Sequence, residues 1–198
     1  PALSNLHSHT FQRAMAGLTE TRGPSEHDSF WTWREVMYRF LDVLTPDEIE
    51  AIAAFAFMEM QEAGFSAVAE FHYLHNRPGG ACYDDPAELS VRIAAAADTT
   101  GIGLTLLPVH YAQGGVDGRP LSGGQLRFRN DLASFEELVS RVPEIVRSLP
   151  ADASWGVAPH SLRAVSRDDL RHLASLAPDR PLHMHIAEQE KELDETRA

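Results

Sequence analysis

Short apolar runs alternate along this chain with longer segments in which large apolar residues recur at helical spacing. The short runs predict buried strands over residues 2–6, 66–71, 102–109, 154–158 and 181–186. The longer segments predict helices over residues 30–40, 46–63, 87–100, 128–149 and 166–177, with a further helix from residue 187 onward. Because helical segments occupy every connection between strands, the pattern predicts a parallel α/β sheet.

Local signals mark the ends of two of these helices. Thr45 precedes Pro46 and two acidic residues, an arrangement typical of a helix start, and Gly64 follows as a stop signal. Ser166 with Asp169 three residues later predicts a variant of the capping box, in which each side chain bonds the other residue's backbone N–H.

Composition and charge exclude several classes of protein. The 198 residues are 43% hydrophobic and carry a net charge of −12, which argues against binding to nucleic acid or to an anionic membrane but leaves a small anionic substrate open. The single cysteine, Cys82, excludes an internal disulfide framework and favours the reducing cytoplasm. No apolar run approaches the roughly 18 residues expected of a membrane span.

The order of the predicted elements fits either an open doubly wound sheet or part of a (β/α)₈ barrel. No Gly-x-Gly-x-x-Gly turn follows the first strand, which counts against a dinucleotide-binding fold. Polar residues instead follow the carboxyl ends of all five strands, where a barrel places its active site. A complete barrel takes about 250 residues. We therefore expect one barrel unit over residues 1–198, with about five of eight strands and truncated before the sixth to eighth.

Two His-x-His pairs stand at the ends of predicted strands. His7 and His9 follow the first strand, and His183 and His185 lie within the fifth. Alternate residues of a strand point to the same side, so each pair presents two imidazoles to one place, and imidazole is a common zinc ligand. The alternative for an isolated pair is two surface histidines, but a second pair far along the chain favours a shared metal site.

Five blocks of sequence resemble the formimidoylglutamate deiminases of the amidohydrolase superfamily. They are Asn5–Gly17, Phe30–Tyr38, Ala69–His75, Ala158–Val165 and His183–Gln189. The His-x-His and His-x-x-Glu spacings are shared across the superfamily, whereas the Phe-Trp-Thr-Trp-Arg and Ala-Pro-His-Ser-Leu-Arg blocks narrow the resemblance to the deiminases. The resemblance implies a metal-dependent, cytoplasmic barrel enzyme of histidine degradation, expected as a homodimer. It would hydrolyse N-formimino-L-glutamate to N-formyl-L-glutamate and ammonia.

The same resemblance assigns expected roles to individual residues. One divalent metal, expected to be Zn²⁺, would be held by His7, His9 and His185, and its bound water would have a pKa near 7. Glu188, three residues after His185, would transfer protons to the imino nitrogen and the leaving ammonia. The expected substrate-binding residues are Gln12, Arg34, Tyr73, His160 and Arg163.

Other interpretations stay open for several of these residues. Sequence physics alone leaves Arg34 as a solvated residue of an aromatic helix and Glu188 as an acid in the first turn of a helix. We interpret His183 as a packed or second-layer histidine, and we assign no role to His72, His75 or His110. His27 and His172 are interpreted as surface residues.

The family pattern also includes a further histidine after the sixth strand and a metal-binding aspartate after the eighth, and neither has a counterpart here. Two other functions therefore remain: a different amidohydrolase deaminase that acts on a purine or pyrimidine, or a non-catalytic fragment. The unpaired strand edges of an unfinished barrel would favour pairing with another chain.

Overall fold

A parallel sheet forms the centre of the computed structural model, which describes residues 2–19, 29–186 and 188–197. Its strands lie in the order β1-β2-β3-β4, and β5 also pairs with β3. All pairs are parallel. The strands are β1 (Leu3–Ser8), β2 (Phe65–His72), β3 (Gly103–His110), β4 (Ser154–Trp155) and β5 (Ala158–Pro159).

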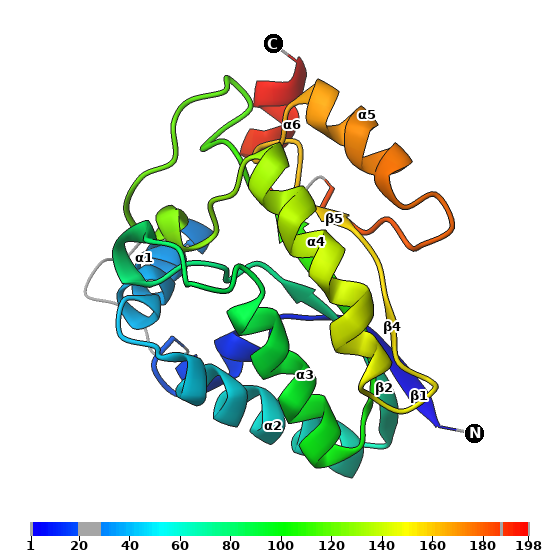
Figure 1. Ribbon diagram of the computed structural model, residues 1–198. Helices are drawn as coiled ribbons and strands as arrows, with labels where there is room; N and C mark the ends of the chain where they lie inside the picture. The colour runs from blue at the N-terminus through cyan, green and yellow to red at the C-terminus, as the bar shows by residue number, and fades with distance from the viewer. Residues whose placement is uncertain (1, 20–28, 187, 198) are drawn as a thin grey trace.

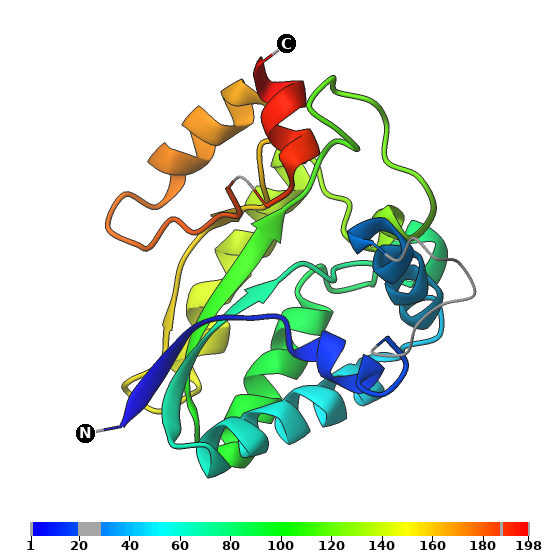
Figure 2. The same ribbon diagram turned by 180° about the vertical axis from the view of Figure 1, so that it is seen from behind.

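Three helices cover one face of this sheet. They are α2 (Pro46–Glu62), α3 (Glu88–Thr100) and α4 (Leu132–Arg147), which lie in front of the strands in Figure 1. In Figure 2 the strands are nearer the viewer and these helices lie behind them. The core between the layers includes Phe57 of α2, Val68 of β2 and Leu106 of β3, each at most 2% exposed. A sheet with helices on its outer face alone is the arrangement expected of part of a barrel.

The remaining elements gather at the carboxyl ends of the strands. The short 3-10 helix η1 (Thr10–Met15) follows β1, and α1 (Phe30–Leu41) lies beside it. Across from them lie α5 (Arg167–Leu176) and α6 (Glu190–Arg197), as Figure 2 shows. Two further 3-10 helices, η2 (Pro78–Gly80) and η3 (Gly123–Arg127), belong to the long loops after β2 and β3. These segments enclose the end of the sheet at which the predicted site residues stand.

The predicted helix signals are found at the helix ends. The Thr45 side chain accepts a hydrogen bond from the backbone N–H of Glu48, and the Glu48 carboxylate accepts one from the backbone N–H of Thr45. Ser166 and Asp169 form the same reciprocal pair at the start of α5. These bonds satisfy amide donors that an uncapped helix leaves unpaired.

Helix α4 begins four residues later than the sequence predicts. We expected it from residue 128, but Asp131 caps the helix through the backbone N–H of Ser134. Asn130, just before the cap, uses its side-chain oxygen to accept from the backbone N–H of Tyr111. This tertiary contact holds residue 130 outside the helix, an effect that local periodicity does not contain.

The fourth and fifth predicted strands are shorter than expected. The fourth is divided into β4 and β5, and the segment predicted as the fifth, 181–186, forms only an isolated bridge between Leu182 and Val157. Pro108 of β3 and Pro159 of β5 lack the backbone N–H that each ladder would need to continue, which explains both interruptions. Hydrogen bonds from Val157 N to Pro181 O and from His183 N to Val157 O still hold the segment beside β5.

None of the helices within the described residues is long and apolar enough to cross a membrane.

Candidate metal and substrate site

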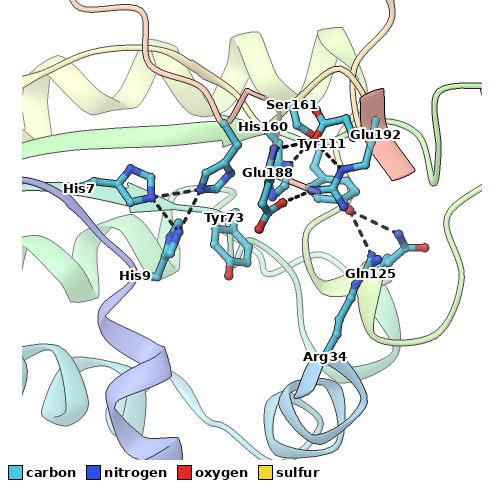
Figure 3. A network of polar contacts seen from close by, with 12 residues as sticks. His7, His9, Arg34, Tyr73, Tyr111, Gln125, His160, Ser161, Glu188 and Glu192 are labelled. Atoms are coloured by element: carbon cyan, nitrogen blue, oxygen red, sulfur yellow. Dashed lines mark hydrogen bonds and ion pairs between the residues drawn. The ribbon is translucent and has the colours of Figure 1, made fainter. Parts of the chain in front are cut away.

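Three imidazole nitrogens converge at the carboxyl end of the sheet. The Nε2 atoms of His7 and His9 lie 3.0 Å apart, those of His9 and His185 lie 3.3 Å apart, and those of His185 and His7 lie 3.1 Å apart. Among the described residues they form a group of potential metal ligands. Figure 3 shows the rings of His7 and His9 pointing to the same place. The sequence separates His7 from His185 by 178 residues, so only the fold brings them together.

The end of β1 is fixed to β2, which sets the position of His9. The backbone N–H and the hydroxyl of Thr10 both donate to Oε1 of the buried Glu70, each at 2.8 Å. The Nδ1 atom of His9 lies 3.0 Å from the carbonyl oxygen of Phe71, to which it can only donate. With its proton on Nδ1, His9 presents a bare lone pair on Nε2 to the other two histidines.

Burial keeps these histidines neutral at pH 7. Burial is the main reason that the pKa of His9 falls from 6.5 to about 3. The charges that neighbouring histidines would carry if protonated add to this lowering, and the hydrogen bond to the Phe71 carbonyl opposes it. Burial is also the main reason that the pKa of His185 falls to about 4. The pKa of His7 is lowered by burial and by His183. Neutral imidazole is the form that binds metal ions.

The triangle of nitrogens fits a tetrahedral divalent metal. Tetrahedral zinc–nitrogen bonds of about 2.0–2.1 Å place the ligand nitrogens about 3.3–3.4 Å apart. The observed separations of 3.0–3.3 Å are slightly shorter, so small movements of the rings would accommodate the ion. The donor set is also suitable, because three neutral nitrogens that leave a position open are typical of catalytic zinc.

A cavity of about 230 Å³ opens beside the histidines. His9 and His185 line one end of it, and Arg34 and Arg163 line it as well. In Figure 3, Tyr73 and Glu188 lie between the His7–His9 pair and Arg34. The other predicted residues that line this cavity are Gln12, Tyr73, His160 and Glu188. All the residues expected from the sequence to bind substrate therefore face one space.

Arg163 is held by two acidic side chains. Its guanidinium forms an ion pair with Glu188, and its Nε atom lies 3.5 Å from a carboxylate oxygen of Glu192. The Arg163 side chain is 12% exposed and that of Glu192 is 2% exposed. The positive charge of Arg163 is thus compensated inside a mostly buried environment, where an unpaired charge would be costly.

A separate group of polar contacts holds Arg34 at the other side of the cavity. The guanidinium of Arg34 donates to the hydroxyl of Tyr38 and lies 3.5 Å from the hydroxyl of Tyr111. Gln125 donates to the same Tyr111 hydroxyl at 3.3 Å. These contacts join α1 to the loop after β3, so Arg34 is a part of the cavity wall and not a solvated residue.

Comparison with known proteins identifies the family. A profile of the Amidohydrolase family matches residues 1–198. The chain belongs to the amidohydrolase family.

Two curated relatives and one solved structure resemble this amidohydrolase along its whole length. Formimidoylglutamate deiminase of Pseudomonas aeruginosa is 51% identical over 100% of this chain and 43% of its own length. An 8-oxoguanine deaminase of the same organism is 28% identical over 98% of this chain and 41% of its own. The crystal structure of an amidohydrolase from Brucella melitensis superposes with a TM-score of 0.93 and 50% identity, covering 98% of this chain and 43% of that one.

These comparisons confirm the predicted fold class. The amidohydrolase chain has the parallel α/β arrangement of a (β/α)₈ barrel, with about five strands present. It spans less than half of the length of the relatives that it matches.

Several cavity residues of this amidohydrolase were missed by the sequence reasoning. Tyr38, Tyr111, Trp33, Met37, Phe30 and Phe128 line the cavity beside the expected residues. Tyr111 follows β3 directly, at the strand end where the other site residues were sought. Tyr38 lies four residues after Arg34 in α1, which places the two on the same face of a helix. Both positions carried a signal that could have identified them.

His160 lies between the three metal-site histidines and the polar contacts around Arg34. Its ring contacts those of Tyr111 and His185, with centroids 4.5 Å and 4.9 Å apart, and its Nδ1 atom lies 2.9 Å from the hydroxyl of Ser161. Burial, with added effects of His185 and Arg163, lowers the pKa of His160 well below 6.5. His160 is therefore a neutral hydrogen-bonding group at the cavity wall.

The other histidines have separate environments. His72, His75 and His110 are buried beneath this end of the sheet, and His75 contacts the carbonyl oxygen of Val109 at 2.9 Å. His172 lies on α5 beside Glu136, with 44% of its side chain exposed, and His27 falls outside the described residues. His183 contacts His7.

Proposed function

We propose that this chain contributes the metal-binding and substrate-binding residues of an enzyme that hydrolyses N-formimino-L-glutamate to N-formyl-L-glutamate and ammonia, a step of histidine degradation. One observation carries the proposal: a single cavity places neutral imidazole nitrogens near one end and two guanidinium groups around the rest. The 51% identity to a formimidoylglutamate deiminase supports the same reaction. As a domain, residues 1–198 would form the part of an amidohydrolase barrel that holds its first five strands.

His7, His9 and His185 would hold one divalent metal, proposed to be Zn²⁺. When bound, such an ion supplies a Lewis acid that activates water at neutral pH. The chain's own contribution is to present nitrogen lone pairs in a fixed arrangement. The contacts of Thr10 with Glu70 and of His9 with Phe71 provide that arrangement before any ion binds.

Arg34 and Arg163 would bind the two carboxylates of the substrate. A guanidinium donates two parallel hydrogen bonds to a carboxylate and also matches its negative charge, which a neutral heterocycle does not carry. Gln12 donates to the Tyr73 hydroxyl at 2.9 Å, so these two side chains form one polar group beside the histidines. Together with His160, they would position the formimino end of the substrate.

Glu188 would act as the proton-transfer group. In the reaction, water adds to the formimino carbon, the bond from that carbon to its terminal nitrogen breaks, and the nitrogen leaves as ammonia. Glu188 would accept the proton released by water and deliver it to the departing nitrogen. Glu188 forms an ion pair with Arg163 in the structure. A substrate carboxylate that binds Arg163 would compete with this contact and free Glu188 for proton transfer.

The proposal is tested by comparing three ligands on the zinc-loaded protein. Ammonia release and calorimetric binding are measured with N-formimino-L-glutamate, guanine and cytosine, and bound zinc is counted by elemental analysis. Selective binding or turnover of N-formimino-L-glutamate supports the proposal. Preference for guanine or cytosine supports a heterocycle deaminase, the alternative suggested by the 28% identical 8-oxoguanine deaminase. Failure to bind zinc and all three ligands supports a non-catalytic chain.

We further propose a cytoplasmic location and a homodimer. The single free cysteine, Cys82, is exposed, which suits a reducing compartment. Leu3 and Leu6 of the edge strand β1 are 61% and 72% exposed, which favours a covering partner. Analytical ultracentrifugation over a range of concentrations tests the dimer, and a monomer at all concentrations would contradict it.

A further inference from the structure

His183 contacts His7 on the side of the ring that faces away from the other two histidines. The Nε2 atom of His183 lies 2.9 Å from Nδ1 of His7, while Nε2 of His7 faces His9 and His185. The two ring centroids are 5.1 Å apart and the ring planes differ by 25°. The centroid separation is close to the N–N distance plus the radii of the two rings, so both nitrogens lie near the line that joins the ring centres. This is the geometry of an in-plane hydrogen bond and not of a face-to-face stack.

The backbone around His183 is fixed independently of this contact. The N–H of His183 donates to the carbonyl oxygen of Val157 at 3.0 Å, and Val157 N–H donates to Pro181 O at 2.9 Å. The bridge between Val157 and Leu182 lies within the same stretch. His183 is therefore held by the edge of the sheet, and it can fix the orientation of His7, whose own strand is on the opposite edge.

The contact links the proton position on His7 to that on His183, because one of the two facing nitrogens must donate and the other accept. A neutral imidazole has one N–H and one lone pair, and the partner of one nitrogen selects the state of the other. If His7 donates its Nδ1–H to His183, its Nε2 lone pair is directed at the point that His9 and His185 share. The carbonyl oxygen of Phe71 has the same effect on His9.

We propose that His183 is a positioning residue for the metal site, accepting the Nδ1–H of His7 and so holding the Nε2 lone pair of His7 toward the ion. This inference rests on the metal site of the proposed function. This geometry does not make His183 a ligand, because its Nε2 atom contacts Nδ1 of His7, on the side of the His7 ring opposite to the metal site. Partners of this kind orient the ligand and raise its affinity for the metal, and their removal costs about 10- to 100-fold in affinity.

The test measures the zinc affinity of three variants by competition with a chromophoric chelator. His183→Leu removes the acceptor, and His183→Gln places an amide oxygen near the position of the lost Nε2. His172→Leu makes the same change at an exposed histidine on α5 and serves as the control. We expect His183→Leu to weaken zinc binding about 10- to 100-fold. We expect His183→Gln to restore most of the affinity and His172→Leu to bind as the parent does.

Two spectroscopic measurements separate positioning from other roles. Nitrogen-15 NMR of the zinc-loaded parent should show His7 protonated at Nδ1, and X-ray absorption should count the same number of nitrogen ligands in the parent and in His183→Leu. An unchanged zinc affinity in a folded His183→Leu variant overturns the inference, and so does the loss of one nitrogen ligand, which would make His183 a ligand itself. Failure of the parent and His183→Gln alike to bind zinc would instead refute the metal site proposed above.

Discussion

Glu188 and Arg163 form an ion pair at the wall of the cavity, between the residue proposed to transfer protons and one of the two proposed to bind substrate carboxylates. Arg163 therefore has a carboxylate partner before any ligand enters. In the proposed reaction, the pair would connect substrate binding to the release of Glu188.

Replacement of Arg163 by alanine should weaken ligand binding without loss of zinc. Hydrogen bonds to charged groups contribute about 1.5–3 kcal/mol, so we expect the Kd for N-formimino-L-glutamate to rise roughly 10- to 150-fold. Calorimetry measures the Kd, and elemental analysis measures the zinc. Arg163→Lys, which keeps the charge but loses the two-pronged geometry, should fall between the parent and Arg163→Ala. Equal loss of zinc and ligand binding would contradict the assignment.

Replacement of Glu188 by glutamine should separate binding from turnover. Without the ion pair, Arg163 no longer has to exchange partners, so we expect N-formimino-L-glutamate to bind at least as tightly as to the parent. Ammonia release should fall about 10²- to 10⁴-fold, the usual contribution of a general acid–base group. Zinc content serves as the control. A variant with weaker ligand binding and full turnover would show that Glu188 is a binding residue instead.

Tyr111 offers a test of how Arg34 is positioned. Its hydroxyl lies between the guanidinium of Arg34 and the amide of Gln125. Tyr111→Phe keeps the ring against His160 and removes only the hydroxyl, so we expect a loss of about 0.5–1.5 kcal/mol in ligand binding, or roughly 2- to 12-fold in Kd. Zinc affinity should not change. If the Kd stays at the parent value, Arg34 is held by Tyr38 alone.

Thr45→Ala tests the cap of α2. The variant loses the side chain that accepts from Glu48 N–H and should lower the free energy of unfolding by about 1 kcal/mol, within a range of about 0.5–2. Urea denaturation measures this free energy. Thr99→Ala makes the same change at an exposed residue in the last turn of α3, which ends at the C-cap Gly101, and should not destabilise the protein. A loss of equal size in both variants would contradict the capping role.

Glu70 should make stability depend on pH. Burial raises the pKa of Glu70 above its ordinary value of 4.5, although the Thr10 bonds lower it in part. The folded state therefore favours the protonated carboxyl, so this contribution is complete below pH 4.5 and is lost as pH rises through the folded-state pKa. We expect the parent to lose stability relative to Glu70→Gln over that rise, measured by urea denaturation at several pH values. A constant difference between the two proteins would contradict this assignment.

Most of the fold was predictable because its signals are local. Apolar periodicity identified the helices and the first three strands, and the Thr45 and Ser166 caps set the starts of α2 and α5. The errors came where distant residues intervene. Asn130 contacts Tyr111 and delays the start of α4, and the prolines at 108 and 159 interrupt ladders whose partners the sequence pattern does not identify.

In the candidate site, too, local spacing predicted the residues, whereas their positions relative to one another depend on contacts between distant residues. The two His-x-His pairs and the His-x-x-Glu spacing named the candidate ligands and the acid from the sequence. The His-x-His spacing alone could not say which histidine of the second pair faces the others, because both lie on one side of an extended segment. The His-x-x-Glu spacing and the family resemblance selected His185 as the ligand and left His183 as a packed or second-layer histidine. The structure places Nε2 of His185 beside Nε2 of His7, and it places Nε2 of His183 against Nδ1 on the opposite side of the His7 ring.

The sequence by itself determined which segments are helical or extended, where several of them begin and end, and which residue types stand at the strand ends. These properties depend on interactions within a few residues. Only the tertiary structure brings His7 to His185, Arg34 to Tyr111, and Arg163 to Glu188. Such contacts join residues separated by 25 to 178 positions. They follow from the order and register of the strands, which are set by packing of the whole sheet and not by any one stretch of the chain.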